Sequence, residues 1–244
     1  MKRSQSVTAF LHEPAIDWWL EERLAWSDGY RCLVGIDEVG RGALAGPVVA
    51  AAVVLPYERV PQGVTDSKLL SPEQREGLYP QIRHLARGVG IGIVNAACID
   101  EINILRATHE AMRLALADLP PGLFPDLALI DGLPVLPFPL AQTALVGGDG
   151  RSASIAAASI IAKVTRDRLM RDFDAVYPGY GFASNKGYGA PIHLRGLSEN
   201  GPCAIHRLTF RPVAESLHRA KPAGSDIPPV SAEVKRTRRT RKTP

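Results

Sequence analysis

Runs of apolar residues bounded by glycine and charged residues mark the first strands of the chain. Residues 31–37 (RCLVGID) are predicted to form one strand, and residues 46–55 (GPVVAAAVVL) form a continuous valine-rich run, as expected for a strand buried on both faces of a sheet. Residues 88–96 provide a third candidate strand. Because the turn between the first two strands is short, we expect them to pair as a hairpin rather than through a crossover connection.

Helical periodicity appears between and after these strands. Ser71 is followed by Pro72 and, three residues after the serine, by Gln74, which is the pattern of a capped helix start. Residues 103–119 place apolar side chains at helical spacing, and residues 152–173 predict a longer helix with a face of small and apolar side chains. The sequence therefore predicts three substantial helices.

Two further strands, over residues 126–130 and 143–146, complete the predicted sheet. A glycine-rich irregular segment and a short helix over residues 191–198 follow the long helix. Strands that come first, with helices interleaved later, favour an α/β fold in which helices flank a mixed sheet.

Composition limits the classes of protein to be considered. Of the 244 residues, 45% are hydrophobic and 22% charged, which are ordinary values for a soluble globular enzyme. Three widely spaced cysteines without a CxxC pair argue against a disulfide framework or a cysteine zinc site. No signal-peptide core is present, and the longest apolar run, residues 43–55, falls short of the roughly 20 residues of a membrane span. We expect a cytoplasmic, monomeric protein without a membrane segment.

The net charge of +4 is concentrated at one end of the chain. Residues 221–244 carry seven Lys or Arg and two acids, whereas the other 220 residues carry 22 basic and 23 acidic side chains. We therefore divide the chain into an N-terminal extension (1–30), a folded domain (31–220) and a basic tail (221–244) that lacks the apolar residues needed to fold. The tail either contacts nucleic acid phosphates or another protein, or is a solvated extension without such a role.

Carboxylates stand at three of the predicted strand ends. Asp37 and Glu38 end the first strand, and Asp131 and Asp149, each followed by glycine, end the fourth and fifth. If they converge, their mutual repulsion in a partly desolvated site requires a cation. Oxygen ligands suit Mg²⁺ or Mn²⁺, and two such ions about 3.5–4 Å apart are the arrangement used for phosphodiester hydrolysis.

An aspartate at a strand end is also common turn chemistry, which is the alternative for Asp131 and Asp149 taken singly. Neighbouring side chains of a regular strand face opposite ways, so Asp37 and Glu38 serve one metal site only if the backbone turns at Glu38. The following Val39 and Gly40 permit such a turn. Spacing alone leaves the convergence of the four acids open.

These residues belong to a series of motifs that resembles the signature of bacterial ribonuclease HII. The motifs occur in one order over residues 31–213, which makes a chance match improbable. They are GIDEVGRG (35–42), AGPVVAA (45–51), DSKLLS (66–71), IDG (130–132), GD (148–149), AASIIAKVTRDR (157–168), NKGY (185–188) and HRLTF (206–210).

The resemblance implies that residues 31–220 form a ribonuclease H-like catalytic domain with a C-terminal helical extension. It implies endonucleolytic cleavage of the RNA strand of RNA–DNA hybrids, and incision 5′ of ribonucleotides embedded in duplex DNA, leaving 5′-phosphate and 3′-hydroxyl ends. It also implies two-metal catalysis with Mg²⁺ or Mn²⁺. The four acids of the family are matched by Asp37, Glu38, Asp131 and Asp149.

The same resemblance assigns the reading of the substrate. Gly40, Arg41 and Gly42 match the family's glycine-arginine-glycine loop, whose backbone reads the ribose 2′-hydroxyl, and close backbone approach requires glycine. Tyr188 matches the tyrosine that packs on the deoxyribose beyond the RNA–DNA junction. Gly147 departs from the pattern, because the family often has lysine there, and the departure puts one local phosphate contact in doubt.

Other polar residues of these motifs admit more than one role. Ser67 and Lys68 could pair as nucleophile and base, but a loop contacting phosphate is favoured. Asp167 could be a metal ligand, but an ion pair on a solvated helix face is favoured. His206 could be a catalytic base, which two-metal chemistry does not need. The basic candidates for contact with the substrate are Lys68, Lys186 and Arg207.

Two other functions remain as alternatives. A non-catalytic binder of hybrids or structured RNA gains nothing from clustered negative charge facing phosphates, so the four acids argue against it. Another two-metal enzyme of this fold class, such as a DNA transposase or resolvase, needs no 2′-hydroxyl reader. The glycine-arginine-glycine loop therefore argues against that class.

Overall fold

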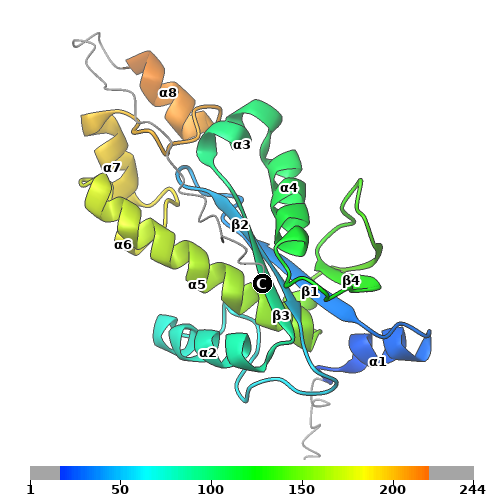
Figure 1. Cartoon of the computed structure of the whole chain (residues 1–244). Helices are drawn as coiled ribbons and strands as arrows, with labels where there is room; N and C mark the ends of the chain where they lie inside the picture. The colour runs from blue at the N-terminus through cyan, green and yellow to red at the C-terminus, as the bar shows by residue number, and fades with distance from the viewer. Residues whose placement is uncertain (1–16, 220–244) are drawn as a thin grey trace, which may run out of the picture.

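The computed structural model describes residues 17–219, in which helices flank a five-stranded mixed sheet (Figure 1). The strands are β1 (Leu33–Val39), β2 (Val48–Val54), β3 (Gly88–Val94), β4 (Leu127–Asp131) and β5 (Ala141–Leu145). Their order is β3-β2-β1-β4-β5, with β2 antiparallel to both its neighbours and β4 parallel to β1 and β5. The predicted mixed sheet and its first hairpin are therefore confirmed.

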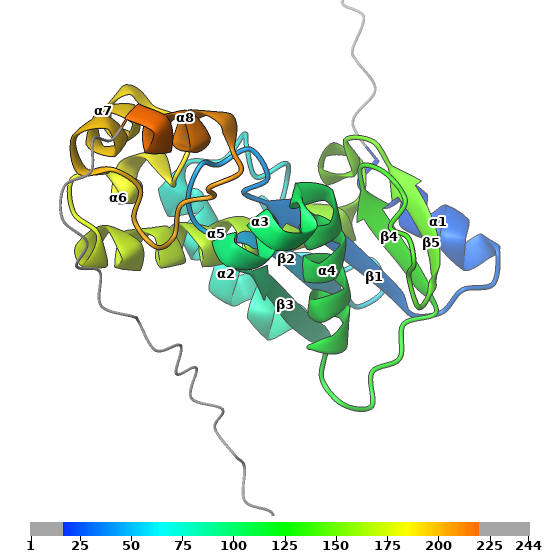
Figure 2. The same ribbon diagram turned by 90° about the horizontal axis from the view of Figure 1, so that it is seen from above.

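Helices make up most of the remaining described chain. They are α1 (Leu20–Ser27), α2 (Pro72–Leu85), α3 (Ala96–Ile102), α4 (Ile104–Ala117), α5 (Ala153–Val176), α6 (Phe182–Asn185), α7 (Pro191–Asn200) and α8 (Arg211–Arg219), with a 3-10 turn, η1, at Gly148–Gly150. Figure 2 shows α6, α7 and α8 gathered at one end of the molecule, and α1 and β5 at the other. The first three of these form the C-terminal helical part expected for the fold.

The central strands are buried because helices cover both faces of the sheet. On one face, apolar side chains of β1 and β2 pack with α4 residues such as Ala107 and Ala111. On the other face, Ala51 and Val53 of β2 pack against α5 and α2. This double covering explains why β2 reads as an unbroken apolar run.

Helix α5 lies unusually close to β1 at Gly35. A Cβ atom at this position would stand 2.2 Å from the backbone carbonyl carbon of Ser154, so only glycine fits. The contact sets the start of α5, and the turn η1 immediately before it, against the sheet. One of the predicted acidic residues, Asp149, lies in that turn.

The N-terminal part of the described chain is attached to this same region. Glu22 of α1 is buried and accepts hydrogen bonds from the Ser152 hydroxyl at 2.6 Å and from the Ser154 backbone N–H at 3.0 Å. The first 16 residues of the predicted extension and the basic tail, 221–244, lie outside the described residues. Within residues 17–219, no helix combines the length and the apolar character needed to cross a membrane.

Candidate active site

Three acidic residues meet at one edge of the sheet. Because β1 and β4 are parallel neighbours with Ile36 opposite Ile130, the next residues, Asp37 and Asp131, lie side by side. Asp149 reaches them from η1. One carboxylate oxygen from each of the three lies within 4.8 Å of the others. This spacing is close enough for one cation to contact all three side chains.

Hydrogen bonds fix the orientation of each carboxylate. The backbone N–H of Glu38 donates to Oδ1 of Asp37 at 2.7 Å, and the backbone N–H of Gly148 donates to Oδ1 of Asp131 at 2.7 Å. The Lys68 ammonium donates to Oδ2 of Asp149 at 2.6 Å. The acids are therefore held in place before any substrate or ion arrives.

The electrostatics of the group favour a bound cation. Burial raises the pKa of Asp37 well above its usual range, and the neighbouring charges of Glu38 and Asp131 raise it further. Burial and the charge of Asp149 also raise the pKa of Asp131. Buried carboxylates that repel one another, with oxygen as the only donor element, are the donor set of hard ions such as Mg²⁺ or Mn²⁺. The residues therefore fit a divalent metal.

Glu38 does not join the other three acids in this structure. Strand β1 continues through Val39, so the backbone does not turn at Glu38 as convergence of all four acids requires. Its carboxylate instead accepts from the Arg41 guanidinium at 3.3 Å. Burial raises the pKa of Glu38. The side chain nevertheless lines the same cavity as Asp37 and Asp131.

That cavity has a volume of about 310 Å³ and is lined by residues from five of the motifs. Its walls are formed by the end of β1, the loop after it, the loop before α2, the end of β4, one face of α5 and the segment after α6. The lining residues are Asp37, Glu38, Val39, Gly40, Arg41, Gly42, Ser67, Lys68, Asp131, Ser159, Lys163 and Tyr188. Asp37, Glu38 and Asp131 therefore face one space together with the glycine-arginine-glycine loop.

Two buried arginines hold the loop that follows β1. The Arg207 guanidinium donates to the carbonyl oxygens of Gly40 at 2.7 Å, Arg41 at 2.8 Å and Gly46 at 2.9 Å. Arg166 donates to the carbonyl of Pro47 at 2.8 Å. Both side chains are fully buried, and burial together with repulsion from Arg166 lowers the pKa of Arg207 to about 9. The loop backbone is thus fixed by its carbonyls, and the amide groups of Leu44 and Gly46, in its second half, donate to the carbonyls of Gly187 and Ile205.

Tyr188 lies beside this loop in the wall of the cavity. A Cβ atom added at Gly42 would lie 3.8 Å from the Tyr188 ring, and the Arg166 guanidinium lies 5.6 Å from the ring centre. The backbone carbonyl of Tyr188 is 2.9 Å from Nδ1 of His193. The ring is 39% exposed, so its face is available to a ligand.

A family model described as Ribonuclease HII matches residues 34–213. The chain belongs to the ribonuclease HII family. Members of this family are divalent-metal-dependent endonucleases that degrade the RNA of RNA–DNA hybrids. Membership excludes the transposase or resolvase alternative and favours an enzyme over a hybrid-binding protein.

Relatives with that name cover most of the chain. It is 52% identical over 212 residues to the Ribonuclease HII of Geobacter sulfurreducens, covering 87% of this chain and 97% of the relative. It is 53% identical over 196 residues to that of Enterococcus faecalis, covering 80% of this chain and 76% of the relative.

Solved structures support the same fold assignment. The ribonuclease H2 of Pyrococcus horikoshii superposes with a TM-score of 0.68 at 27% identity, covering 78% of this chain and 98% of that chain. The ribonuclease HII in a complex with PCNA from Archaeoglobus fulgidus superposes with a TM-score of 0.63 at 29% identity, covering 74% of this chain and 95% of that chain.

The structure places the other predicted substrate-binding residues in different ways. Lys68 lines the cavity, whereas Lys186 lines a neighbouring cavity. The Arg207 side chain does not line the cavity, because its guanidinium is buried beneath the loop and donates to backbone carbonyls. His206 is likewise buried, and its ring contacts His193 and Cys203 rather than lining the cavity.

Two cavity residues were not singled out from the sequence. Ser159 hydrogen-bonds the Ser67 hydroxyl at 2.7 Å and also the Asp37 carboxylate, and Lys163 lines the same wall. Their spacing could have identified them from the sequence, because Ser159, Lys163 and Asp167 are four residues apart and so lie on one face of α5. Asp167 pairs with Lys163 at 2.6 Å, which is the predicted ion pair.

Proposed function

We propose that this chain incises the RNA strand of RNA–DNA hybrids, and incises duplex DNA on the 5′ side of an embedded ribonucleotide. The observation that carries the proposal is the meeting of the Asp37, Asp131 and Asp149 carboxylates beside the glycine-arginine-glycine loop, with Asp37 and Asp131 lining the same cavity as that loop. Carboxylates that hold cations serve phosphodiester hydrolysis, and a rigid loop backbone serves recognition of a ribose.

In this proposal, Asp37, Asp131 and Asp149 hold two divalent cations, Mg²⁺ or Mn²⁺, with Glu38 as the fourth ligand. Bound cations would supply Lewis acidity at the scissile phosphate and lower the pKa of the attacking water. The Glu38–Arg41 ion pair does not prevent this role, because the Arg41 side chain is about half exposed and such pairs contribute only about 0–1 kcal/mol. The family acids would thus act together.

The reaction balances as a hydrolysis. A water oxygen forms a bond to phosphorus, the bond from phosphorus to the 3′ oxygen breaks, and the water protons go to solvent and to that oxygen. The products are a 3′-hydroxyl and a 5′-phosphate. Asp37 and its neighbours are oriented for this step by the hydrogen bonds from Glu38 and Gly148.

Selection of RNA falls to the backbone amides of Gly40, Arg41 and Gly42. A 2′-hydroxyl is the group that separates RNA from DNA, and a loop whose carbonyls are already bonded presents its remaining polar groups to the ligand. Tyr188, beside the loop, would pack against the neighbouring deoxyribose. Lys68 would place a cation beside the phosphate. We further propose that the protein is cytoplasmic and acts as a monomer; its described cysteines are free thiols.

The test uses duplex DNA with one ribonucleotide, labelled at the 5′ end of that strand. We expect incision only with Mg²⁺ or Mn²⁺, on the 5′ side of the ribonucleotide, and none in the matched all-DNA duplex. Incision without a divalent ion, or equal cutting of the all-DNA duplex, would refute the proposal.

A further inference from the structure

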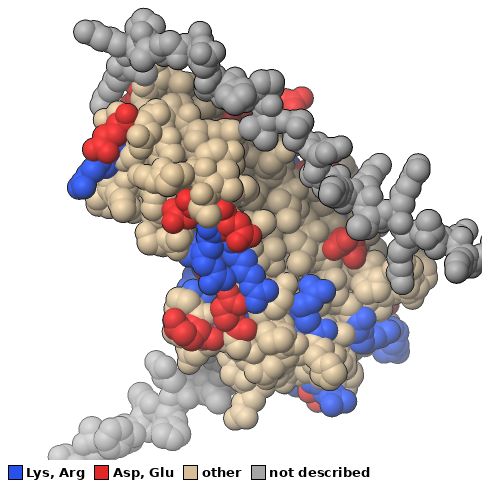
Figure 3. Space-filling model, turned by 60° about the vertical axis from the view of Figure 1, so that its left-hand side comes forward, with Lys and Arg blue, Asp and Glu red and all other residues tan. Residues whose placement is uncertain are grey.

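A second cavity, of about 350 Å³, adjoins the active site and shares Lys163 with it. Residues from α2, from α5 and from the segment around α6 line it, and we call it the basic pocket. Figure 3 shows Lys and Arg side chains gathered in a hollow of the surface with acidic residues at its borders. The charged residues that line the basic pocket are Arg75, Glu76, Lys163, Asp167, Arg171 and Lys186.

Acidic partners neutralise only part of this charge. Lys163 pairs with Asp167 at 2.6 Å, and Arg171 pairs with Glu76 at 2.6 Å. Glu76 also binds Arg168, from just outside the pocket, so one carboxylate serves two guanidinium groups. Four cations therefore face two acids among the lining residues.

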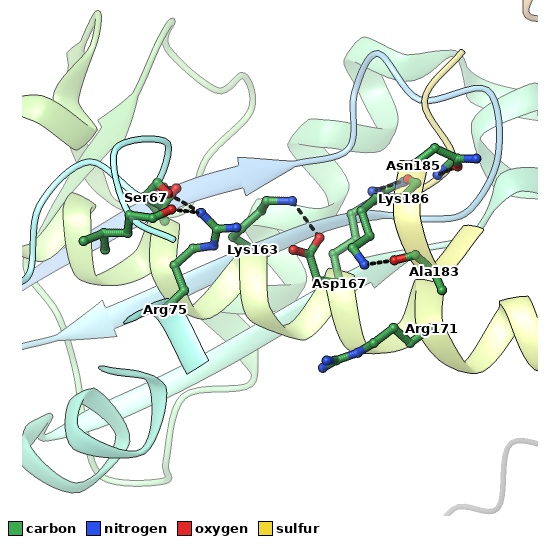
Figure 4. A network of polar contacts seen from close by, with 12 residues as sticks. Ser67, Arg75, Lys163, Asp167, Arg171, Ala183, Asn185 and Lys186 are labelled. Carbon is green, nitrogen blue, oxygen red and sulfur yellow. Dashed lines mark hydrogen bonds and ion pairs between the residues drawn. The ribbon is translucent and has the colours of Figure 1, made fainter. Parts of the chain in front are cut away.

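The other two cations are held by backbone carbonyls. Arg75 donates to the carbonyl of Ser67 at 2.7 Å, and the Lys186 ammonium donates to the carbonyl of Ala183 (Figure 4). A carbonyl orients a cation without cancelling its charge. The pocket therefore keeps an excess of positive charge with its donors already positioned, which is the arrangement that binds an anion.

Lys186 occupies a backbone position that does not favour lysine. Its φ is +54°, in the left-handed region that glycine and asparagine adopt more readily. The turn is held by Arg166, which donates to the Lys186 carbonyl at 2.8 Å, and by Asn185, which accepts from the Gly187 N–H at 2.7 Å. Burial lowers the pKa of the Lys186 ammonium. Strain of this kind is typical of positions whose side chain serves a function.

The spacing along α5 connects the two cavities. Ser159 and Lys163 line the active site, whereas Lys163, Asp167 and Arg171 line the basic pocket. Each step of four residues advances about 6 Å along the helix axis. The basic pocket therefore begins about one helical turn from the carboxylates, which is within reach of a nucleotide next to the one that is cut.

We propose that the basic pocket binds one backbone phosphate of the nucleic acid and so sets the register of the duplex on the carboxylates. The proposal rests on the proposed function, because it takes the same substrate. A phosphodiester from the strand that is cut and one from the opposite strand have the same chemistry, and the experiment separates them.

The first experiment compares Lys186→Asn and Arg171→Gln with a matched control, Arg83→Gln. Asparagine tolerates the left-handed turn, and Arg83 is an exposed arginine in the last turn of α2 that does not line either cavity. Binding of a fluorescein-labelled duplex with one ribonucleotide is measured by anisotropy, without metal, over a series of salt concentrations. Arg171→Gln remains informative if Lys186→Asn disturbs the turn.

We expect each pocket variant to raise Kd about three- to tenfold near 0.1 M salt and to lower the slope of log Kd against log salt by about 0.9, the value for one lost phosphate contact. The control should match the wild-type protein. A pocket variant with unchanged Kd and slope would overturn the proposal.

The second experiment replaces single phosphates, in turn and on either strand, by neutral methylphosphonates. We expect one linkage at which the difference between wild-type protein and the pocket variants disappears, and its strand identifies the source of the phosphate. A difference that survives at every linkage would indicate a diffuse field and would overturn a discrete subsite. Failure of the wild-type protein to incise would instead refute the proposed function. The binding results would still show whether the basic pocket binds a backbone phosphate.

Discussion

Arg207 offers the sharpest test of how the loop after β1 is held. The Arg207→Lys substitution keeps the positive charge but removes the planar fork that spans three carbonyls, those of Gly40, Arg41 and Gly46. A lysine ammonium at the end of a different stem reaches one of them. The other two carbonyls then lose the hydrogen bond that the buried Arg207 guanidinium donates to them.

The expected effect on stability follows from that count. Each buried carbonyl that loses its donor costs about 1–3 kcal/mol, so the variant should lose roughly 2–6 kcal/mol of unfolding free energy. For a protein of this size, 1 kcal/mol corresponds to about 2–4 °C in Tm, which gives a decrease of roughly 4–24 °C. The exposed control Arg83→Lys should change the unfolding free energy by at most about 0.5 kcal/mol.

The expected effect on recognition separates a structural role from a role in reading the ribose. Two duplexes that differ only in one 2′-hydroxyl are bound, without metal, by the wild-type protein and by Arg207→Lys. Loss of one well-placed hydrogen bond from the loop should reduce the preference for the ribonucleotide about tenfold. A variant that melts earlier but keeps the full preference would refute the link between the arginine and recognition, and one unchanged in both would refute the whole argument.

Three further predictions follow from the acids and the tail. Asp37→Asn should abolish turnover yet raise the metal-free Tm, because it removes a buried charge that burial and its neighbours disfavour; retained turnover or a lower Tm would contradict this. Because the folded-state pKa values of Asp37, Glu38 and Asp131 are raised, stability without metal should be full at low pH and decline as pH rises through those values, so the gain in Tm from Mg²⁺ should grow as pH rises above the usual carboxyl range. A gain in Tm from Mg²⁺ that does not change with pH would contradict the raised pKa values of these acids. Deleting residues 221–244 should weaken binding mainly at low salt and leave the metal requirement unchanged, whereas an unchanged salt slope would show that the tail is a bystander.

Sequence patterns correctly predicted those elements that depend only on residues close together in the chain. The start of α2 is the best case, because the Ser71 hydroxyl accepts from the Gln74 N–H at 3.3 Å and the Gln74 side chain accepts from the Ser71 N–H at 2.7 Å. The hairpin of β1 and β2 was predictable for the same reason. Both depend on residues only a few positions apart.

Other local features were missed, among them a short helix in a segment to which the sequence analysis gave no element. The segment before the predicted helix over 103–119 forms a separate helix, α3. Asn103, with φ +70°, separates α3 from α4. Asn95 and Asn103 each cap the helix that follows, so the two asparagines were the available signal. Asp149 was expected at a strand end, but it lies in a 3-10 turn after β5.

The arrangement of the site could not be read from spacing. The pairing of β1 with β4, residues almost a hundred positions apart, is what sets Asp37 beside Asp131, and the regular path of β1 through Val39 keeps Glu38 outside the group. Arg207 was predicted from the sequence only as a basic candidate for contact with the substrate. Only the nearby loop carbonyls, which belong to a distant part of the chain, explain its burial.

The most direct test of the central claim is anomalous diffraction from crystals soaked in Mn²⁺. The account predicts manganese peaks in the cavity, at roughly 2.1 Å from carboxylate oxygens of Asp37 and Asp131, with Asp149 and Glu38 completing the ligands. Crystals of protein that incises the ribonucleotide-containing duplex, but that show no manganese in contact with these carboxylates, would contradict the account.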